Sequence, residues 1–541
     1  MAAEAQVFDS VPRCVEDTLS FNILIHPQKM KPRHLLAIVT IATTLIATVH
    51  AQTVPSPEQV LKSTQASFKE YFELLSMPND AIVPADIVKN AVWLEVAFAK
   101  RGFVTRQLAN GGKPLVYAEY PKKVAGAKTI LFYMHFDGQP VLPEQWAQKN
   151  PWQAVVKQRD AKGAWEIVPS ERLTADKLDA ELRVFARSSS DDKGPIMMML
   201  AAFDALKASG MEPGINVKVL LDSEEEKGSP TIDRVATEHK ALLRADGIVI
   251  HDGPMHASAK PTLVFGNRGN TTVTLTVYGP KSPLHSGHYG NYVPNPAQRL
   301  AALLASMKDD EGRVTIAGYY DRVKLTEAER KILAEVDDNE AALKKRVGIA
   351  KPESVGRNYQ EALQYPSLNI RGLAAAAIGD KASNIVPSKA IAELDLRTTP
   401  EAGPELLFGL IEAHIKGKGW YLAKGEPSDT ERATYDKIAS LSLGRGSRAA
   451  RTPIDSPLGA WASGVLANAN ALDRAPAGLV RIRMMGGSVP TDKLVDALEI
   501  PFVILPLVNG DNNQHSYDEN LRIGNYLDGV GTFTRLLRTS F

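Results

Sequence analysis

The stretch Thr129-Ile130-Leu131-Phe132-Tyr133-Met134-His135-Phe136-Asp137-Gly138 decides the fold class of this chain. An apolar run over residues 129–134 ends abruptly in polar and turn-forming residues. Short apolar runs bounded in this way are typical of strands buried inside a parallel sheet. We therefore predict a buried strand whose carboxyl end carries His135 and Asp137.

The same pattern recurs further along the chain. Apolar residues over 183–186, 217–221 and 247–250 each run into a polar segment. Helical patterns accompany these runs over residues 57–75, 86–100 and 196–208. Strands that alternate with helices indicate an α/β protein with a doubly wound sheet, parallel or mixed, in which ligands bind beyond the carboxyl ends of the strands. His, Asp and Glu repeatedly occupy those ends.

The pattern changes after Gly266, where residues 271–277 alternate like a half-solvated strand. Further strands are predicted over 367–373 and 390–397, helices over 296–307 and 404–415, and a charged helical insertion over 327–346. This order suggests a small α+β, ferredoxin-like lid or dimerisation domain inserted into the first domain. We place the catalytic domain at residues 52–266 and 455–541 and the lid at residues 267–454.

Length and charge narrow the functional classes. The chain has 541 residues, and single cores stop growing at roughly 250–300 residues, so two or more domains are expected. Its 63 basic and 62 acidic residues leave a net charge of +1, which provides no basic surface for nucleic acid. Hydrophobic residues at 44% and charged residues at 23% are ordinary for a globular protein and exclude a disordered or fibrous chain.

The N-terminal region has the pattern of an export signal. Lys31 and Arg33 precede an apolar run over 35–49 and a small-residue exit at Val49-His50-Ala51. The run is shorter than the roughly 20 residues of a membrane span, which favours a cleaved secretory signal over an uncleaved anchor. We expect residues 1–29 to be an upstream extension and residues 30–51 a signal peptide. The mature chain would begin near Gln52, in the periplasm or outside the cell.

The single cysteine, Cys14, lies in that extension. The mature protein would therefore contain no disulfide, no thiolate metal ligand and no cysteine nucleophile. Metal ions would be held by carboxylates and imidazoles, which bind divalent cations without thiols. His135 and Asp137 lie two apart on an extended segment, so both side chains project to the same side and Asp137 can orient an imidazole from behind.

Several separated motifs resemble one known family when they are taken in order. They are His135-Phe136-Asp137, Ser190-Asp191-Asp192-Lys193-Gly194, Glu225-Glu226-Lys227-Gly228-Ser229, Asp252, His285-Ser286-Gly287 and His515-Ser516. This order is similar to that of the co-catalytic zinc exopeptidases, which include carnosinase-type dipeptidases, the bacterial glutamate carboxypeptidase, aminoacylases and desuccinylases. The resemblance extends from about residue 60 to the end of the chain.

The resemblance implies a pair of metal ions and a role for each matching residue. The implied metal ligands are His135, Asp191, Glu226, Asp252 and His515, with Asp191 bridging both ions. The implied catalytic residues are Glu225 as general base, Asp137 as the partner of His135, and His285 as a donor to the carbonyl oxygen that reaches across a dimer. Glu519 is implied to support His515, and the implied substrate contacts are Arg397, Asn384 and Ser488. One motif departs from the family, because Ala186-Arg187-Ser188 stands where Gly-Arg-Gly is commonest.

The chemistry of these residue types points to hydrolysis. Bound metal ions lower the pKa of water to about 7, and a neighbouring carboxylate can pass its proton to the leaving amine. We predict a metal-dependent exopeptidase that cleaves dipeptides or C-terminal residues, with an N-acyl-amino-acid amidohydrolase as the alternative. The expected cofactors are two divalent ions, Zn²⁺ first, with Mn²⁺ or Co²⁺ as other fits. The expected partners are a small peptide substrate and a second copy of the chain, with no nucleic acid and no stable membrane anchor.

Other interpretations of the same residues compete with this one. Ser190-Asp191-Asp192-Lys193 fits the Ser-x-x-Lys signature of penicillin-binding enzymes, but the further elements of that signature, within residues 285–291, stand in reversed order. A metal-stabilised binding protein without catalysis is a second alternative, which the presence of Glu225 disfavours. A calcium loop at residues 511–513 is a third, and it lacks the spaced acidic ligands of such loops.

Overall fold

The computed structural model describes residues 53–467, 478–487 and 491–541. The predicted upstream extension, the predicted signal peptide and Ser488 lie outside the described residues. Among the described helices, none combines the length and the hydropathy needed to cross a bilayer.

A mixed eight-stranded sheet forms the larger part of the fold. Its strand order is β1-β2-β7-β3-β8-β20-β9-β19. The strands are β1 (Val104–Leu108), β2 (Leu115–Glu119), β3 (Thr129–His135), β7 (Asn216–Asp222), β8 (Gly247–Ile250), β9 (Thr262–Val264), β19 (Val480–Ile482) and β20 (Phe502–Ile504). The neighbours β7, β3, β8 and β20 run parallel, whereas β1 and β2 form an antiparallel edge. The predicted strands at 129–134, 217–221 and 247–250 are confirmed.

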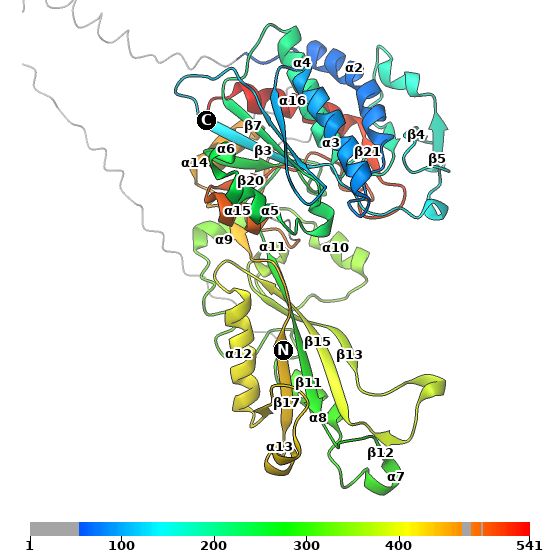
Figure 1. Cartoon of the computed structure of the whole chain (residues 1–541), viewed down its shortest axis with the longest axis vertical. Coiled ribbons are helices and arrows are strands. Elements are labelled where there is room, and N and C mark those ends of the chain that lie inside the picture. Colours follow the sequence, from blue (N-terminus) through cyan, green and yellow to red (C-terminus); the bar gives the residue numbers. More distant parts are fainter. Residues whose placement is uncertain (1–52, 468–477, 488–490) are drawn as a thin grey trace, which may run out of the picture. The chain divides into compact units, whose positions relative to one another are not determined.

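Helices cover both faces of this sheet (Figure 1). One layer contains α2 (Pro57–Leu75), α3 (Pro84–Ala99), α4 (Lys193–Ala208), α14 (Pro457–Ala467) and α16 (Ile523–Arg538), and the other α5 (Ile232–Glu238), α6 (Lys240–Leu243) and α15 (Thr491–Leu498). Ile130, Phe132 and Met134 pack into the first layer, while Leu131 and Tyr133 pack into the second. The run is continuously apolar because each of its two faces is buried.

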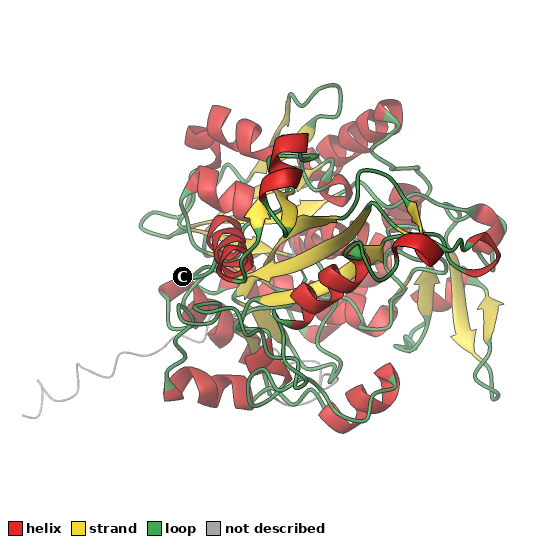
Figure 2. Ribbon diagram, turned by 90° about the horizontal axis from the view of Figure 1, so that it is seen from below, coloured by secondary structure: helices red, strands yellow, loops and turns green. Residues whose placement is uncertain are grey.

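The prediction of a parallel strand at residues 183–186 is wrong. The strand β6 (Arg183–Phe185) belongs to a separate antiparallel sheet of order β21-β6-β4-β5. Its partners are β4 (Val155–Arg159), β5 (Trp165–Val168) and β21 (Asn520–Arg522), and the β4–β5 hairpin lies at the right edge of Figures 1 and 2. Burial of this short run comes from those partners, with Trp165 packing edge-on against Phe185. The β6–β21 pairing brings together segments that are far apart in the sequence.

A second, five-stranded sheet has the order β13-β15-β11-β17-β16. Its strands are β11 (Gly269–Tyr278), β13 (Ser367–Ala374), β15 (Lys389–Thr398), β16 (Tyr421–Leu422) and β17 (Ile438–Leu443). Helices α8 (Pro296–Ala305) and α12 (Pro404–Gly417) pack on one face, which explains the alternating burial of β11. These elements confirm the mixed α+β character expected of the inserted part. The exact domain limits stay a prediction.

The predicted charged helical insertion over 327–346 contains two helices. Helix α9 spans Glu327–Ala334 and α10 spans Glu340–Val347. Asn339 adopts a left-handed backbone with φ of 46° and accepts a hydrogen bond from the N–H of Ala342, which starts a new helix. Asp and Asn side chains compete for backbone groups in this way and favour turns over helix interiors.

Candidate metal centre

The predicted ligands converge at the carboxyl edge of the parallel strands. His135 ends β3, the loop after β7 carries Glu225 and Glu226, and Asp252 follows β8. Because these strands are neighbours and parallel, their polar ends meet at one edge. Asp191 comes from the loop after β6, and His515 from the loop before β21.

The candidate ligand atoms form two groups, and the carboxylate of Asp191 lies between them. One group contains His135, Glu225 and Asp252, and the other contains Asp191, Glu226 and His515, with the ligand atoms of each group within 4.8 Å of one another. The Oδ1 atom of Asp191 lies 2.8 Å from Nε2 of His135, and its Oδ2 atom lies 3.1 Å from Nε2 of His515. The two oxygens of one carboxylate therefore face the two groups, as a bridging ligand requires.

The electrostatics of the cluster fit a pair of divalent cations. Burial, together with repulsion from Asp191, raises the pKa of Glu226 to about 8 and that of Asp252 to about 6. Burial and the neighbouring Asp252 raise the pKa of Glu225 well above its ordinary value. A hydrogen bond to Asp191 raises the pKa of His515 to about 9. Cations remove the repulsion between the carboxylates, and imidazole with carboxylate is a donor set that Zn²⁺ and Mn²⁺ accept.

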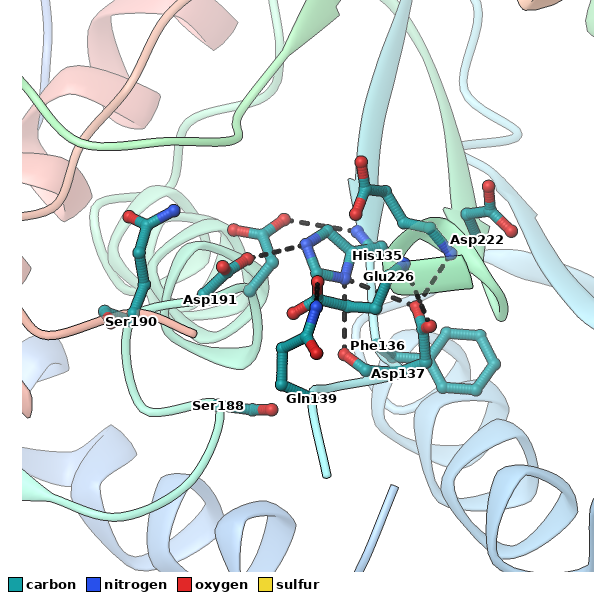
Figure 3. Close-up of polar contacts among 12 residues, drawn as sticks. His135, Phe136, Asp137, Gln139, Ser188, Ser190, Asp191, Asp222 and Glu226 are labelled. Atoms are coloured by element: carbon teal, nitrogen blue, oxygen red, sulfur yellow. Dashed lines mark hydrogen bonds and ion pairs between the residues drawn. The ribbon is translucent and has the colours of Figure 1, made fainter. Parts of the chain in front are cut away.

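Asp137 contacts His135 and also fixes the loop of the two glutamates (Figure 3). Its Oδ1 lies 3.4 Å from Nδ1 of His135 and accepts the backbone N–H of Glu225 at 3.0 Å. Its Oδ2 accepts the N–H of Glu226 at 3.1 Å. The predicted partner of His135 thus orients an imidazole and the next loop at once, which is how residues behind a metal site set its geometry.

Glu519 holds the loop that carries Asp191. It is fully buried and accepts hydrogen bonds from the backbone N–H groups of Ser188, Ser190 and Asp191. It also accepts a hydrogen bond from Nη1 of Arg187 at 2.8 Å, and Nη2 of Arg187 donates to the carbonyl of Ser516 at 3.0 Å. Glu519 therefore contacts the Asp191 loop rather than His515 itself. Arg187 connects Glu519 with Ser516, the residue next to His515.

These contacts explain the departure from Gly-Arg-Gly. Ser188 has a φ of 59°, in the left-handed region that favours glycine. The serine is held there by its N–H bond to Glu519 and by a hydrogen bond from Nδ2 of Asn79 to its hydroxyl at 3.0 Å. Ser188 thus adopts a backbone conformation that glycine favours, at a position where glycine is commonest in the family.

Gln139 is a site residue that the sequence analysis missed. Its Nε2 donates to Oε2 of Glu226 at 2.6 Å. The alternation rule that places His135 and Asp137 on one side of an extended segment extends to the next odd position and could have found it.

Two alternative interpretations lose their support at this site. The hydroxyl of Ser190 donates to Glu519, while the buried ammonium of Lys193 donates to the carbonyls of Leu74 and Met77. The pair therefore lacks the serine–lysine contact of a penicillin-binding enzyme. Asp511 pairs with Arg183 at 2.7 Å and lies 3.6 Å from Arg522, so these guanidinium groups already balance the charge that a calcium ion would need.

The remaining predicted residues lie on the second sheet and its neighbours. His285 ends β12 (Leu284–His285), and Asn384 precedes β14 (Ile385–Val386). The two segments are joined by a hydrogen bond from the N–H of Ser286, next to His285, to the carbonyl of Asn384 at 2.9 Å. Arg397 on β15 pairs across the sheet with Ser367 and Asn270. Within the described residues, none of these side chains belongs to the two metal-ligating groups.

A family model described as peptidase family M20/M25/M40 matches residues 131–539. The chain belongs to this family. The resemblance indicated by the motifs is thereby confirmed.

The relatives match over most of their length. A Cys-Gly metallodipeptidase of Schizosaccharomyces pombe is 29% identical over 429 residues, which cover 78% of this chain and 81% of that protein. A Beta-Ala-His dipeptidase of Mus musculus is 26% identical over 420 residues, covering 75% of each chain. The crystal structure of an M20 family metallo-carboxypeptidase from Sulfolobus solfataricus matches with a TM-score of 0.65 at 26% identity, covering 87% of this chain and 98% of that one.

The contacts of Glu519 lead to a stability prediction. Replacing Glu519 by Gln keeps the shape but leaves the buried Arg187 without its charge partner, so we expect the free energy of unfolding to fall by about 3 kcal/mol. Metal content should fall with it, because the Asp191 loop loses its anchor. Urea denaturation and metal analysis measure both effects. Glu181→Gln is the control, because that side chain is 71% exposed; equal losses in the two variants would contradict the assignment.

Proposed function

We propose that this protein is a metal-dependent dipeptidase with a dinuclear centre. The observation that carries the proposal is the pair of candidate ligand groups, one of them containing Glu225, that the two oxygens of the Asp191 carboxylate face. Two curated relatives are named as dipeptidases, which favours peptide bonds over the N-acyl bonds of the alternative.

Each residue of the centre has a definite part in this proposal. His135 and Asp252 would hold one cation, Glu226 and His515 the other, and Asp191 both. When bound, such cations supply an activated water at neutral pH and polarise the substrate carbonyl. Glu225 would take a proton from the attacking water and deliver it to the leaving amine.

The base assignment gives the first test of function. We expect Glu225→Gln to lower kcat for Cys-Gly or β-Ala-His by about 10²–10⁴-fold, because the proton relay is lost while the proposed metal ligands remain. Dipeptides and N-acyl-amino acids are assayed side by side after metal removal and reconstitution. The exposed Glu238→Gln is the matched control. Turnover of N-acyl substrates alone, or full activity in Glu225→Gln, would overturn the proposal.

We propose Zn²⁺ as the native metal, with Mn²⁺ and Co²⁺ as the alternatives that the same donors accept. The proposal is checked by elemental analysis of the protein purified without added metal. Reconstitution with each ion separately then identifies the one that restores most activity. If another ion predominates in both measurements, the proposal of Zn²⁺ as the native metal is wrong.

A homodimer is proposed as the working assembly. The strand β13 forms an edge of its sheet and exposes Ile370 and Leu373, and apolar edge strands favour pairing with another chain. His285 lies on the β12–β14 ladder, outside the metal-ligating groups. In this proposal His285 serves the site of the partner subunit, where it donates to the oxygen that gains negative charge.

Subunit mixing tests this arrangement. We expect His285→Ala to lower kcat by about 10²–10³-fold, as for loss of an oxyanion donor. Mixing inactive His285→Ala with inactive Glu225→Gln and allowing the subunits to exchange should restore activity, because hybrid dimers then contain one intact site. Activity that stays at the sum of the separate variants would place His285 in its own subunit's site or outside catalysis, and size-exclusion chromatography checks that dimers form.

We also propose that the protein is exported. The basic and apolar segments at residues 30–51 support it. On expression in a bacterial host we expect the periplasmic or secreted form to begin near Gln52, as measured by mass spectrometry of the intact chain. A cell-retained protein with residues 1–51 still attached would contradict this proposal.

A further inference from the structure

Helix α3 is apolar on its inner and on its outer side. Its inner side packs into the main core, where Leu94 and Phe98 are fully buried. Its outer side carries three valines spaced four residues apart, and they are 38% (Val88), 48% (Val92) and 63% (Val96) exposed. The outer side of a surface helix is ordinarily polar, and an exposed apolar patch with a polar border is typical of a contact surface.

This outer side lies at an edge of the larger sheet. Helix α3 contacts β1 and β2, and β1 is the edge strand (Figure 1). Ala85 and Ala99 are exposed near the two ends of the helix, and they align with Val92 because residues seven apart differ by only about 20° around a helix. Lys89 and Glu95 border the valines. We call these seven residues, 85, 88, 89, 92, 95, 96 and 99, the α3 face.

The α3 face is self-complementary about its centre. Counted outward from Val92, its members form matched pairs: Lys89 with Glu95, Val88 with Val96, and Ala85 with Ala99. Two copies of α3 that pack antiparallel about a two-fold axis at Val92 therefore bring valine against valine and alanine against alanine. Lys89 of each copy then meets Glu95 of the partner subunit. A two-fold contact uses the same patch on both subunits and requires this kind of pattern.

We propose that the α3 face is a two-fold interface between two copies of this chain. Valines four residues apart form a ridge that packs into the matching groove of a second helix, and the charged pairs fix the direction and register of the two helices. This face belongs to the larger sheet, whereas the β13 edge belongs to the second sheet. The α3 contact is therefore separate from the proposed β13 contact, and both can occur in one assembly.

Sedimentation equilibrium of the purified protein tests the contact. Val92→Glu sets two carboxylates against each other on the two-fold axis, so we expect an assembly with half the mass of the wild type. Position 92 is half exposed, so the fold should accept the change, and circular dichroism checks this. Val347→Glu is the matched control, because Val347 is a 55% exposed valine on α10, and its mass should equal that of the wild type. An unchanged mass in Val92→Glu would overturn the proposal.

Disulfide cross-linking tests the direction and register of the helices. In a Cys14→Ala background, Val92→Cys places the only cysteine of each subunit on the axis, and oxidation should give a covalent dimer. The two copies of position 88 are offset by eight residues along the helices, which is about 12 Å. Cα atoms more than about 7 Å apart do not form a disulfide, so Val88→Cys should stay uncross-linked. Equal cross-linking of the two variants, or none in Val92→Cys, would contradict the arrangement.

Charge reversal tests the contact between Lys89 and Glu95. Lys89→Glu creates two like-charge contacts in each interface, and we expect the dissociation constant at low salt to rise by about tenfold. Adding Glu95→Lys restores opposite charges and should return the constant to within about threefold of the wild type. Positions 89 and 95 lie about 9 Å apart along one helix, so this rescue reports on the contact between subunits. A double variant as weak as Lys89→Glu would speak against the proposal.

Dipeptide hydrolysis, measured in parallel, keeps this proposal separate from the proposed function. Among the described residues, the two metal-ligating groups include no member of the α3 face, so Val92→Glu should retain the kcat of the wild type. Halved mass without hydrolysis in either protein would overturn the dipeptidase and keep the interface. If Val92→Glu instead keeps its mass and loses binding to phosphatidylcholine vesicles, the α3 face contacts lipid and the proposal is wrong.

Discussion

Buried negative charge is the constraint on which the rest of this structure depends. The carboxylates around Asp191 outnumber the imidazoles of His135 and His515, and burial of unpaired charge is costly. Such a cluster persists only if the backbone holds the groups in place and cations neutralise them. Asp137 holds the loop of the glutamates, and Glu519 holds the loop of Asp191. The carboxylates behind the site are therefore as much a part of its construction as the ligands.

Local patterns allowed much of the fold to be predicted. The run at residues 129–134 is apolar on both faces because it is covered on both, and this composition is visible in the sequence. The start of α2 was predicted in the same way, because Ser56 is a favoured N-cap residue and Pro57 is favoured at the first helical position. The candidate ligands were predicted from the order of motifs, because each of them sits at the end of a strand or in a loop of recognisable composition. The meeting of His135, Glu226 and Asp252 at one edge then follows from the parallel arrangement of β3, β7 and β8, whereas Asp191 and His515 come from loops next to β6 and β21.

Features that depend on distant partners escaped prediction. The three residues of β6 read as a parallel strand because nothing local shows that β21 is their neighbour. The same pairing decides where Glu519 points, so its contact with the Asp191 loop was equally invisible. The break between α9 and α10 had a local signal in Asn339, which the sequence analysis did not use. Non-local pairing thus accounts for the error at β6, and an unused local signal for the missing helix boundary.

The burial of α4 limits which parts of this protein can accept substitutions. Nearly every residue of α4 is enclosed between α2, α16 and the sheet, and the loop of Asp191 leads directly into it. A shift of that helix would disturb the core on every side. Substitutions that change the volume of a side chain in α4 would therefore destabilise the fold. The connection between α8 and β13 is built from short helices with exposed turns and carries none of the ligands. Substitutions in this connection can therefore accumulate while the candidate metal centre keeps its geometry.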